Sequence, residues 1–223
     1  VGQGHFLNSV LLVGVLEGDG RDPGQRGDDP MLMARWQWEF LGRPAPFSQG
    51  DFEFSPEAVG SFSLAAARVR GPYTRFSTAG GGQLDGFETG GDDRYTIEQW
   101  QQGFAWRYTG WSVQQEYHEK RIEDHETGRR SMLRGGYAQF GKAWPMAWTE
   151  RGLPVEIALR YARVKWKDTP RDREQQEWSL VSNVFLYGHD NKLSADLSWL
   201  EVEEAAGPAG DDVRLRLQWD VSF

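Results

Sequence analysis

Apolar and polar residues alternate one by one along much of this chain. The segment 213–223 is the clearest case, because every second residue from Val213 to Phe223 is apolar and the residues between are Arg, Gln, Asp and Ser. A β-strand turns successive side chains to opposite faces, whereas a helix repeats about every 3.6 residues. The pattern therefore predicts strands that each have one apolar and one polar face.

The same alternation predicts about ten strands joined by two kinds of connection. Regular alternation is found at 31–40, 99–108, 111–118, 155–162, 193–199 and 213–223, and less regular strands are expected at about 6–18, 61–70, 132–142 and 178–187. Two kinds of connection alternate. Long glycine-rich, charged loops are expected at 18–30, 78–93, 123–131, 167–175 and 203–212. The other set is more compact, at 108–110, 143–154 and 188–192, with a longer member at 42–60. This order is typical of an up-and-down antiparallel meander.

The length of the strands and the placement of aromatic residues favour a membrane. Strands of a soluble sandwich have ~5–6 residues, and a tilted strand needs ~9–11 to cross a bilayer, which these match. Aromatic residues gather at strand ends, where a barrel meets the lipid headgroups. The girdle expected on this basis consists of Trp36, Trp38, Trp106, Tyr108, Trp111, Trp219 and Phe223. Because lipid cannot satisfy unpaired backbone groups, a spanning sheet must close on itself.

The fold class predicted is therefore all-β: a transmembrane up-and-down antiparallel β-barrel, forming a single domain over 1–223. A soluble antiparallel sandwich or a lipocalin-type barrel stays open as an alternative, because a sheet with one face on a core also alternates. The two folds differ in which residues face inward. A soluble fold packs its apolar residues inside, whereas a membrane pore turns its polar residues toward internal water.

Composition narrows the function classes. The 223 residues include no cysteine, which excludes disulfide scaffolds, thiolate metal sites and a cysteine nucleophile. The net charge of −8 argues against a nucleic-acid partner, because binding phosphate backbones requires a basic face. The 11 tryptophans fit either a ligand groove or a headgroup belt. We expect no cofactor and no resident metal.

Several segments resemble the phosphate-selective porin O/P family of bacterial outer-membrane proteins. They are PYTRFSTAGGGQLDGF (72–87), QWQQGFAWRYTGWSVQQEYHEKRIED (99–124), GGYAQFGKAWP (135–145), LRYARV (159–164), GHDNKLSADLSWLE (188–201) and QWDVSF (218–223). The resemblance implies a barrel of about sixteen strands, a homotrimer in outer-membrane lipid, and small ions or phosphate as permeants. It also implies that the N-terminal strands of the barrel are absent from this chain.

The polar positions of the alternating strands are expected to line a pore. The charged residues among them are Arg35, Glu39, Arg107, Glu116, Glu156, Arg160, Asp196, Arg214, Arg216 and Asp220. Positive and negative charges balance in this set, so the residues themselves predict passive diffusion of small hydrophilic solutes. An anion or phosphate preference would need an excess of Arg or Lys, and it is implied here by the resemblance. The paired positions Arg214 and Arg216 are the best local sign of it.

The glycine-rich loop 77–93 is a candidate constriction, because glycine permits tight turns and close backbone approach. Its candidate residues are Gly80, Gly81, Gly82, Gln83 and Asp85. A mobile surface loop is the alternative. A phosphate-cradling P-loop is excluded, because no Gly-Lys-Ser/Thr follows.

We expect the protein not to be an enzyme, although two catalytic alternatives stay open. One is a metal or activated water held by Glu116, His118, Glu123, Asp124 and His125. The other is a ten-stranded outer-membrane protease, for which 124–125 and 189–190 supply Asp–His neighbours. An adhesin or substrate binder acting through its extracellular loops is a third possibility. The compact connections and the C-terminal residue are expected on the periplasmic side, and the long loops outside.

Overall fold

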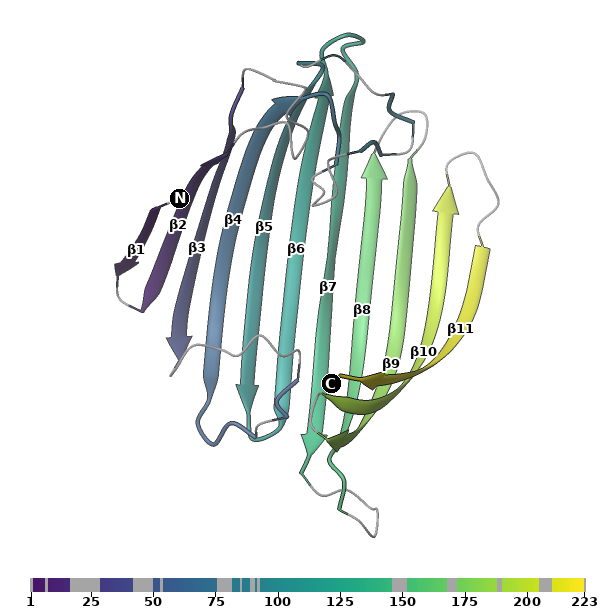
Figure 1. The fold of residues 1–223 in the computed structure, drawn as a ribbon. Helices are drawn as coiled ribbons and strands as arrows, with labels where there is room; N and C mark the ends of the chain where they lie inside the picture. Colours follow the sequence, from purple (N-terminus) through teal and green to yellow (C-terminus); the bar gives the residue numbers. More distant parts are fainter. Residues whose placement is uncertain are drawn as a thin grey trace.

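The strands form one antiparallel sheet in which each strand pairs with its neighbours in chain order (Figure 1). This computed structural model describes residues 2–6, 8–16, 29–41, 50–52, 54–75, 82–84, 86–88, 91, 93–145, 152–167, 172–187, 190–204 and 210–222. Its strands are β1 (Gly2–Phe6), β2 (Ser9–Leu16), β3 (Met31–Leu41), β4 (Val59–Gly71), β5 (Tyr95–Tyr108), β6 (Trp111–Asp124), β7 (Arg130–Trp144), β8 (Val155–Lys167), β9 (Arg173–Tyr187), β10 (Asn191–Glu204) and β11 (Gly210–Val221). Over these residues, we find no helix long and apolar enough to cross a membrane.

The all-β, up-and-down antiparallel organisation is confirmed, with one strand more than the expected ten. The segment 6–18, expected to be one strand, contains a tight turn that separates β1 from β2, and Phe6 pairs with Ser9 across it. Asn8 has a φ of 57° in this turn. Asparagine tolerates the left-handed conformation better than most residues, which makes it a turn signal within an apolar run.

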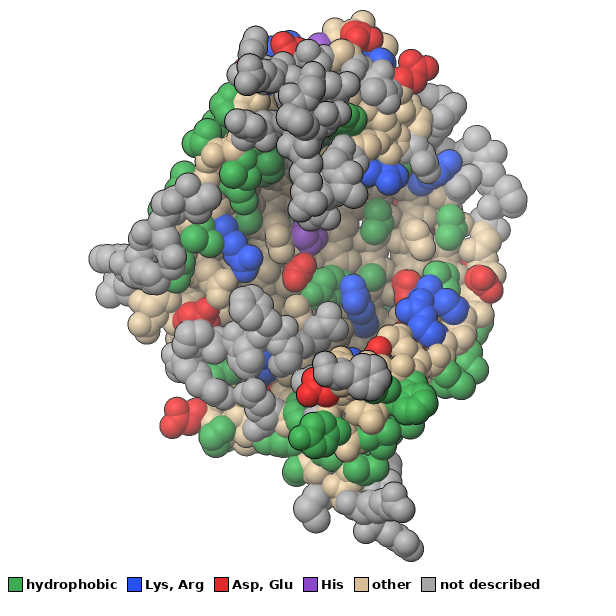
Figure 2. All heavy atoms as spheres, viewed as in Figure 1, with side chains coloured by type: hydrophobic (Ala, Val, Ile, Leu, Met, Phe, Trp, Pro, Cys, Tyr) green, Lys and Arg blue, Asp and Glu red, His purple; other side chains and the backbone are tan. Residues whose placement is uncertain are grey.

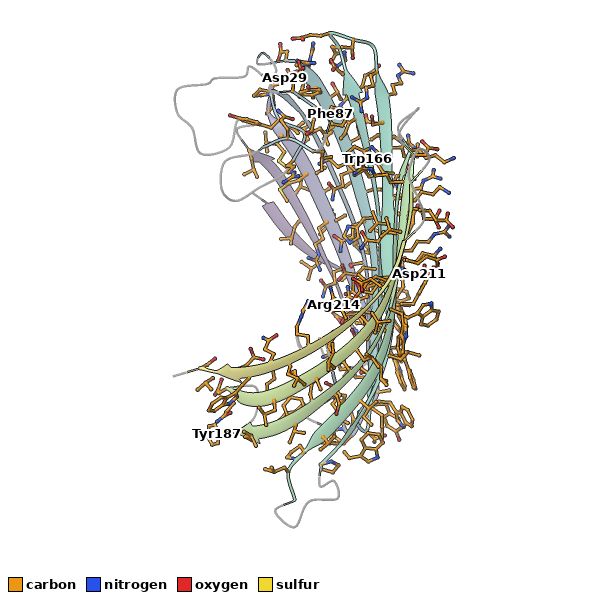
Figure 3. All side chains as sticks on the ribbon, turned by 90° about the vertical axis from the view of Figure 1, so that its right-hand side faces the viewer. Asp29, Phe87, Trp166, Tyr187, Asp211 and Arg214 are labelled. Carbon is orange, nitrogen blue, oxygen red and sulfur yellow. The ribbon has the colours of Figure 1, made fainter. Side chains whose placement is uncertain are left out.

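The pairing register aligns the polar positions of one strand with the polar positions of the next, and the apolar positions with the apolar ones. The sheet therefore has two chemically different faces. Ser198 pairs with Arg214 on one face, and Trp199 pairs with Val213 on the other. The sheet is strongly curved, and Arg214 and Trp166 lie on its concave side in Figure 3. The concave face therefore carries the polar positions of the alternation, and the convex face carries the apolar positions.

The sheet is not closed within the described residues. β1 pairs only with β2, and β11 pairs only with β10. The strands end at two rims, which we name after their connections. The long-loop rim carries the connections β2–β3, β4–β5, β6–β7, β8–β9 and β10–β11, and the short-turn rim carries the others.

A small apolar core lies on the concave face near the long-loop rim. Phe87, from the β4–β5 connection, lies over this face and packs with Tyr95 and Trp166 at ring-centroid distances of 5.7 and 6.4 Å. Its other members are Val69, Ile97 and Ile122, with Met31, Leu84 and Leu133 at its margin. A segment of the longest described connection is thus folded onto the sheet by burial of aromatic surface.

Candidate functional site

The concave face collects all ten residues predicted to line a pore. The register places on this one face Arg35 and Glu39 of β3, Arg107 of β5, Glu116 of β6, Glu156 and Arg160 of β8, Asp196 of β10, and Arg214, Arg216 and Asp220 of β11. Charged side chains of both signs lie in the hollow that Figure 2 shows from this side. The exposure of the ten differs, because Arg107 and Glu156 are buried while Arg35 and Arg216 are exposed.

Five of the ten line one hollow of about 370 Å³ on the concave face of β7–β11. They are Glu156, Arg160, Asp196, Arg214 and Arg216. Three guanidinium groups and two carboxylates of the predicted set therefore share this hollow, and Glu177 adds a third carboxylate to its lining.

Hydrogen bonds hold one of the three arginines in this hollow, whereas another is free. The Arg214 Nη2 atom donates to Glu177 Oε1 at 2.9 Å and to Ser198 Oγ at 3.2 Å. Arg216, which pairs in register with Asp196, makes no ion pair with any described residue. Arg160 lies over the Tyr137 ring at 4.1 Å from its centroid. Arg216 is thus the exposed guanidinium of this hollow that has no ion pair with a described residue.

Further charged residues of this face were missed by the sequence analysis, among them Lys120, Glu177 and Lys192. Lys120 and Glu177 lie within β6 and β9, beyond the limits expected for these strands at 111–118 and 178–187. Extending the alternation of 111–118 by two residues would have found Lys120. Lys192 lies 3.7 Å from Asp220, which gives this predicted carboxylate an ion-pair partner.

The described part of the glycine-rich loop lies against the concave face. Gln83 donates to the Pro72 carbonyl at 2.7 Å and accepts from Thr74 Oγ1 at 2.8 Å, while the Gly82 carbonyl accepts from the Thr74 and Arg75 amides. Lys120 donates to the carbonyl of Thr74. These bonds tie the two ends of the loop to each other and to β6. The other candidates, Gly80, Gly81 and Asp85, lie outside the described residues.

Residues 50–52 and 54–55, which we call the short-rim segment, cover the concave face at the short-turn rim and were not predicted. The buried Asp51 carboxylate accepts from the Gly110 amide at 2.6 Å, from the Ser55 amide at 3.1 Å and from Ser55 Oγ at 2.7 Å. The Phe52 ring packs against that of Phe185 on β9, with centroids 4.5 Å apart and an interplanar angle of 44°. The segment therefore runs from the β3–β4 connection across to β9.

The convex face carries the six girdle residues that the structure describes. They are Trp36, Trp38, Trp106, Tyr108, Trp111 and Trp219, while Phe223 lies outside the described residues. Large apolar side chains of this face are open: the girdle residue Trp219 is 67% exposed, and Leu217 on the same strand is 75% exposed. This apolar exposure extends from Val13 on β2 to β11.

The side chains proposed for catalysis have structural partners. Asp124 accepts from the Arg94 guanidinium at 3.1 Å and from the Glu126 amide at 2.9 Å, so it holds the β6–β7 turn. This hydrogen bond raises the pKa of the Arg94 guanidinium. His125 bonds Thr96 at 2.8 Å, and His189 lies outside the described residues.

Glu116 and His118 lie 3.2 Å apart on the concave face, and Gln101 donates to Glu116 at 3.5 Å. Over the described ranges, no group of three or more His, Asp or Glu side chains could hold a metal ion. The constellation 116–125 is also divided by the sheet, because Glu123 points to the convex face opposite to His118.

No protein-family model matches this chain, and no curated protein matches it.

Proposed function

We propose that this chain forms part of the wall of an outer-membrane β-barrel pore for passive diffusion of small hydrophilic solutes and ions. The observation that supports it is the inverted arrangement of the sheet, with charged residues on the concave face and open apolar side chains on the convex face. Water around the convex face would be unfavourable, because each Å² of apolar surface costs ~25 cal/mol. A hydrocarbon layer removes that cost.

A soluble sandwich or lipocalin-type barrel fits this arrangement poorly. Either fold would bury Leu215, Leu217 and Trp219 in its interior and expose Arg214 and Arg216 to solvent. In this sheet the three apolar residues lie on the outside of the curve. A large contiguous apolar surface on the outside of a protein marks a site of contact with a membrane or with another protein.

Closure of the barrel and its oligomeric state are parts of the same proposal. Among the described residues, the outer edges of β1 and β11 have no strand partner, and a hydrocarbon layer does not tolerate unpaired backbone groups. We therefore propose that additional strands close the barrel, up to the roughly sixteen strands of the family that the chain resembles. A homotrimer belongs to this proposal as well.

Two inward segments support a narrowed pore. Residues 82–84 and 86–88 lie against the concave face near the long-loop rim, and residues 50–52 and 54–55 lie near the short-turn rim. Between them the free guanidinium of Arg216 favours anions, although nearby carboxylates offset much of this charge. Weak anion preference, extending to phosphate, is the selectivity we propose.

Single-channel recording tests the proposal. The full-length protein is inserted into a planar bilayer, and reversal potentials are measured in asymmetric chloride and then phosphate solutions. Stable ion-conducting steps are expected, with a reversal potential displaced toward that of the anion. Folded, inserted protein that conducts no ions would contradict the proposal and favour an adhesin or a protease.

A further inference from the structure

A row of charged side chains crosses the convex face of β6–β9 on the long-loop side of its aromatic residues. Glu119, Arg134, Lys165 and Glu174 are register neighbours on four successive strands. The aromatic pair Tyr161 and Trp178 lies nearer the short-turn rim, with ring centroids 4.7 Å apart. Aromatic residues in this position mark the headgroup level in a membrane protein, so the charged row lies at or beyond that level.

With Arg121 and Arg163 beside it, this row carries more positive than negative groups, although the whole chain has a net charge of −8. Glu119 bonds both Arg121 and Arg134, at 2.8 and 2.9 Å, and its side chain is only 6% exposed. Glu174 bonds both Arg163 and Lys165, at 2.5 and 3.0 Å, and its side chain is 12% exposed.

The four cationic side chains remain between 39% and 58% exposed. Each carboxylate is thus covered by two cations, whose remaining N–H groups face outward. Within this set of six, four positive groups against two negative ones leave a local excess that attracts an anion. Glu98 and Glu203, the register neighbours of Arg121 and Glu174, flank the set on either side.

A groove of about 440 Å³ adjoins this row. Its floor is formed by Gly136 and Ala138, and its walls are the rings of Tyr117 and Tyr161. A Cβ atom on Gly136 would lie 2.6 Å from the Glu116 carbonyl oxygen, so the close backbone approach keeps this floor bare. Arg134, Arg163 and Lys165 line one part of the groove. An apolar channel with cations beside it matches a molecule that has a hydrocarbon chain and an anionic head.

We propose that this groove binds a lipid with a phosphorylated headgroup. The acyl chain lies over Gly136 and Ala138, and the phosphate contacts Arg134, Arg163 and Lys165. Arginine and lysine beside an aromatic belt reach headgroup phosphates in this way. The inference rests on the proposed function, because it requires the convex face to lie in a membrane.

The test compares the wild-type protein with the variant R134Q/R163Q/K165Q. Binding of lipid A, a phosphorylated acyl glycolipid, is titrated in detergent micelles and compared with that of the same lipid after dephosphorylation. We expect the variant to bind lipid A at least about tenfold more weakly, since each cation contributes to headgroup attraction. The dephosphorylated lipid is expected to bind both proteins equally. Ala138→Phe, which fills the groove, should weaken binding of both lipids.

Two control variants protect this test from folding effects. Lys142→Gln removes a convex-face cation at the other rim and should leave lipid A affinity unchanged. E119Q/E174Q keeps all four cations and removes both carboxylates, so lipid A should bind at least as tightly as to the wild type. Equal lipid A affinity of R134Q/R163Q/K165Q and the wild type would overturn the inference. So would a change in oligomeric state alone, which would assign this face to a second copy.

Conductance of the same variants separates this inference from the proposed function. R134Q/R163Q/K165Q should conduct like the wild type, because none of its three positions faces the pore. Wild-type protein that binds lipid A through phosphate but conducts no ions would reject the pore and retain the lipid site. Wild-type protein that conducts ions but binds lipid A independently of its phosphates would retain the pore and reject the lipid site.

Discussion

At the scale of single residues, Arg216 is the side chain expected to set ion preference. Its guanidinium is exposed on the concave face and makes no ion pair with a described residue. A unit charge acts on an ion about 6 Å away in water with ~0.7 kcal/mol, or about threefold in local concentration. Arg216→Gln should therefore lower the chloride-to-potassium permeability ratio by up to about threefold, as measured by the reversal potential in a salt gradient.

Arg163→Gln is the matched control for this change, because it removes the same charge from the convex face. Its reversal potential should equal that of the wild type. If both variants shift the potential equally, the total charge of the protein would set selectivity, and the pore position of Arg216 would be wrong.

Asp51 is the residue expected to hold the inward segment at the short-turn rim. Replacing it with alanine leaves the amides of Gly110 and Ser55 without their acceptor, and each such loss costs about 1–3 kcal/mol. Hydrogen exchange at both amides should become about tenfold faster or more in Asp51→Ala. Glu57→Ala, an exposed change in the same connection, should leave these rates unchanged. Slow exchange at Gly110 in Asp51→Ala would remove Asp51 as the anchor.

At the scale of elements, Phe87 supplies the aromatic contact that holds the described residues 82–84 and 86–88 on the sheet. The carbonyls of Gly86 and Glu88 add hydrogen bonds from Arg129 at 2.8 Å and from the Tyr95 hydroxyl at 2.6 Å. Phe87 packs with Tyr95 and Trp166, and the Arg129 guanidinium lies 4.5 Å from the centroid of its ring. Removing a buried phenylalanine side chain costs about 3–5 kcal/mol in protein cores. Phe87→Ala should free the segment from the concave face and increase single-channel conductance. A conductance equal to that of the wild type would show that this segment does not narrow the pore.

The strands could be predicted from the sequence because their alternation is local. Arg214, Trp219 and their neighbours on β11 show a period of two without reference to any other part of the chain. Ends of strands were harder: β9 begins at Arg173, in the polar run 173–177, where few apolar residues mark the period. The turn at Asn8 was missed because apolar residues continue on both sides of it.

The inward segments could not be predicted, because their contacts join distant parts of the chain. Asp51 and Gly110 are 59 residues apart in sequence. Phe87 reaches Trp166 on a strand three places along the sheet from β5. A glycine-rich loop sequence indicates that tight turns are allowed, but it does not say which face the loop covers. The face that the loop covers is determined by the apolar patch around Ile97 and Ile122, and this patch forms only when the strands have paired.

At the scale of the whole molecule, the curved sheet should separate lipid from water at every second residue. The chain has no cysteine of its own, so single cysteines give a labelling pattern without background. Positions 214, 216 and 218 of β11 lie on the concave face, and positions 213, 215, 217 and 219 lie on the convex face. In a membrane-spanning barrel, a membrane-impermeant thiol reagent reaches the first set through the pore and is kept from the second by hydrocarbon.

Single cysteines across 213–219, in protein reconstituted into lipid vesicles, should therefore react with a period of two. The same expectation extends to Arg160 on the concave face and to Trp36 and Trp106 on the convex face. Denaturation in detergent should make all positions reactive, which controls for the intrinsic reactivity of each thiol. A soluble fold would reverse the pattern, because its convex positions are open to water. Equal reaction of both sets in vesicles would mean that the sheet does not separate two solvents.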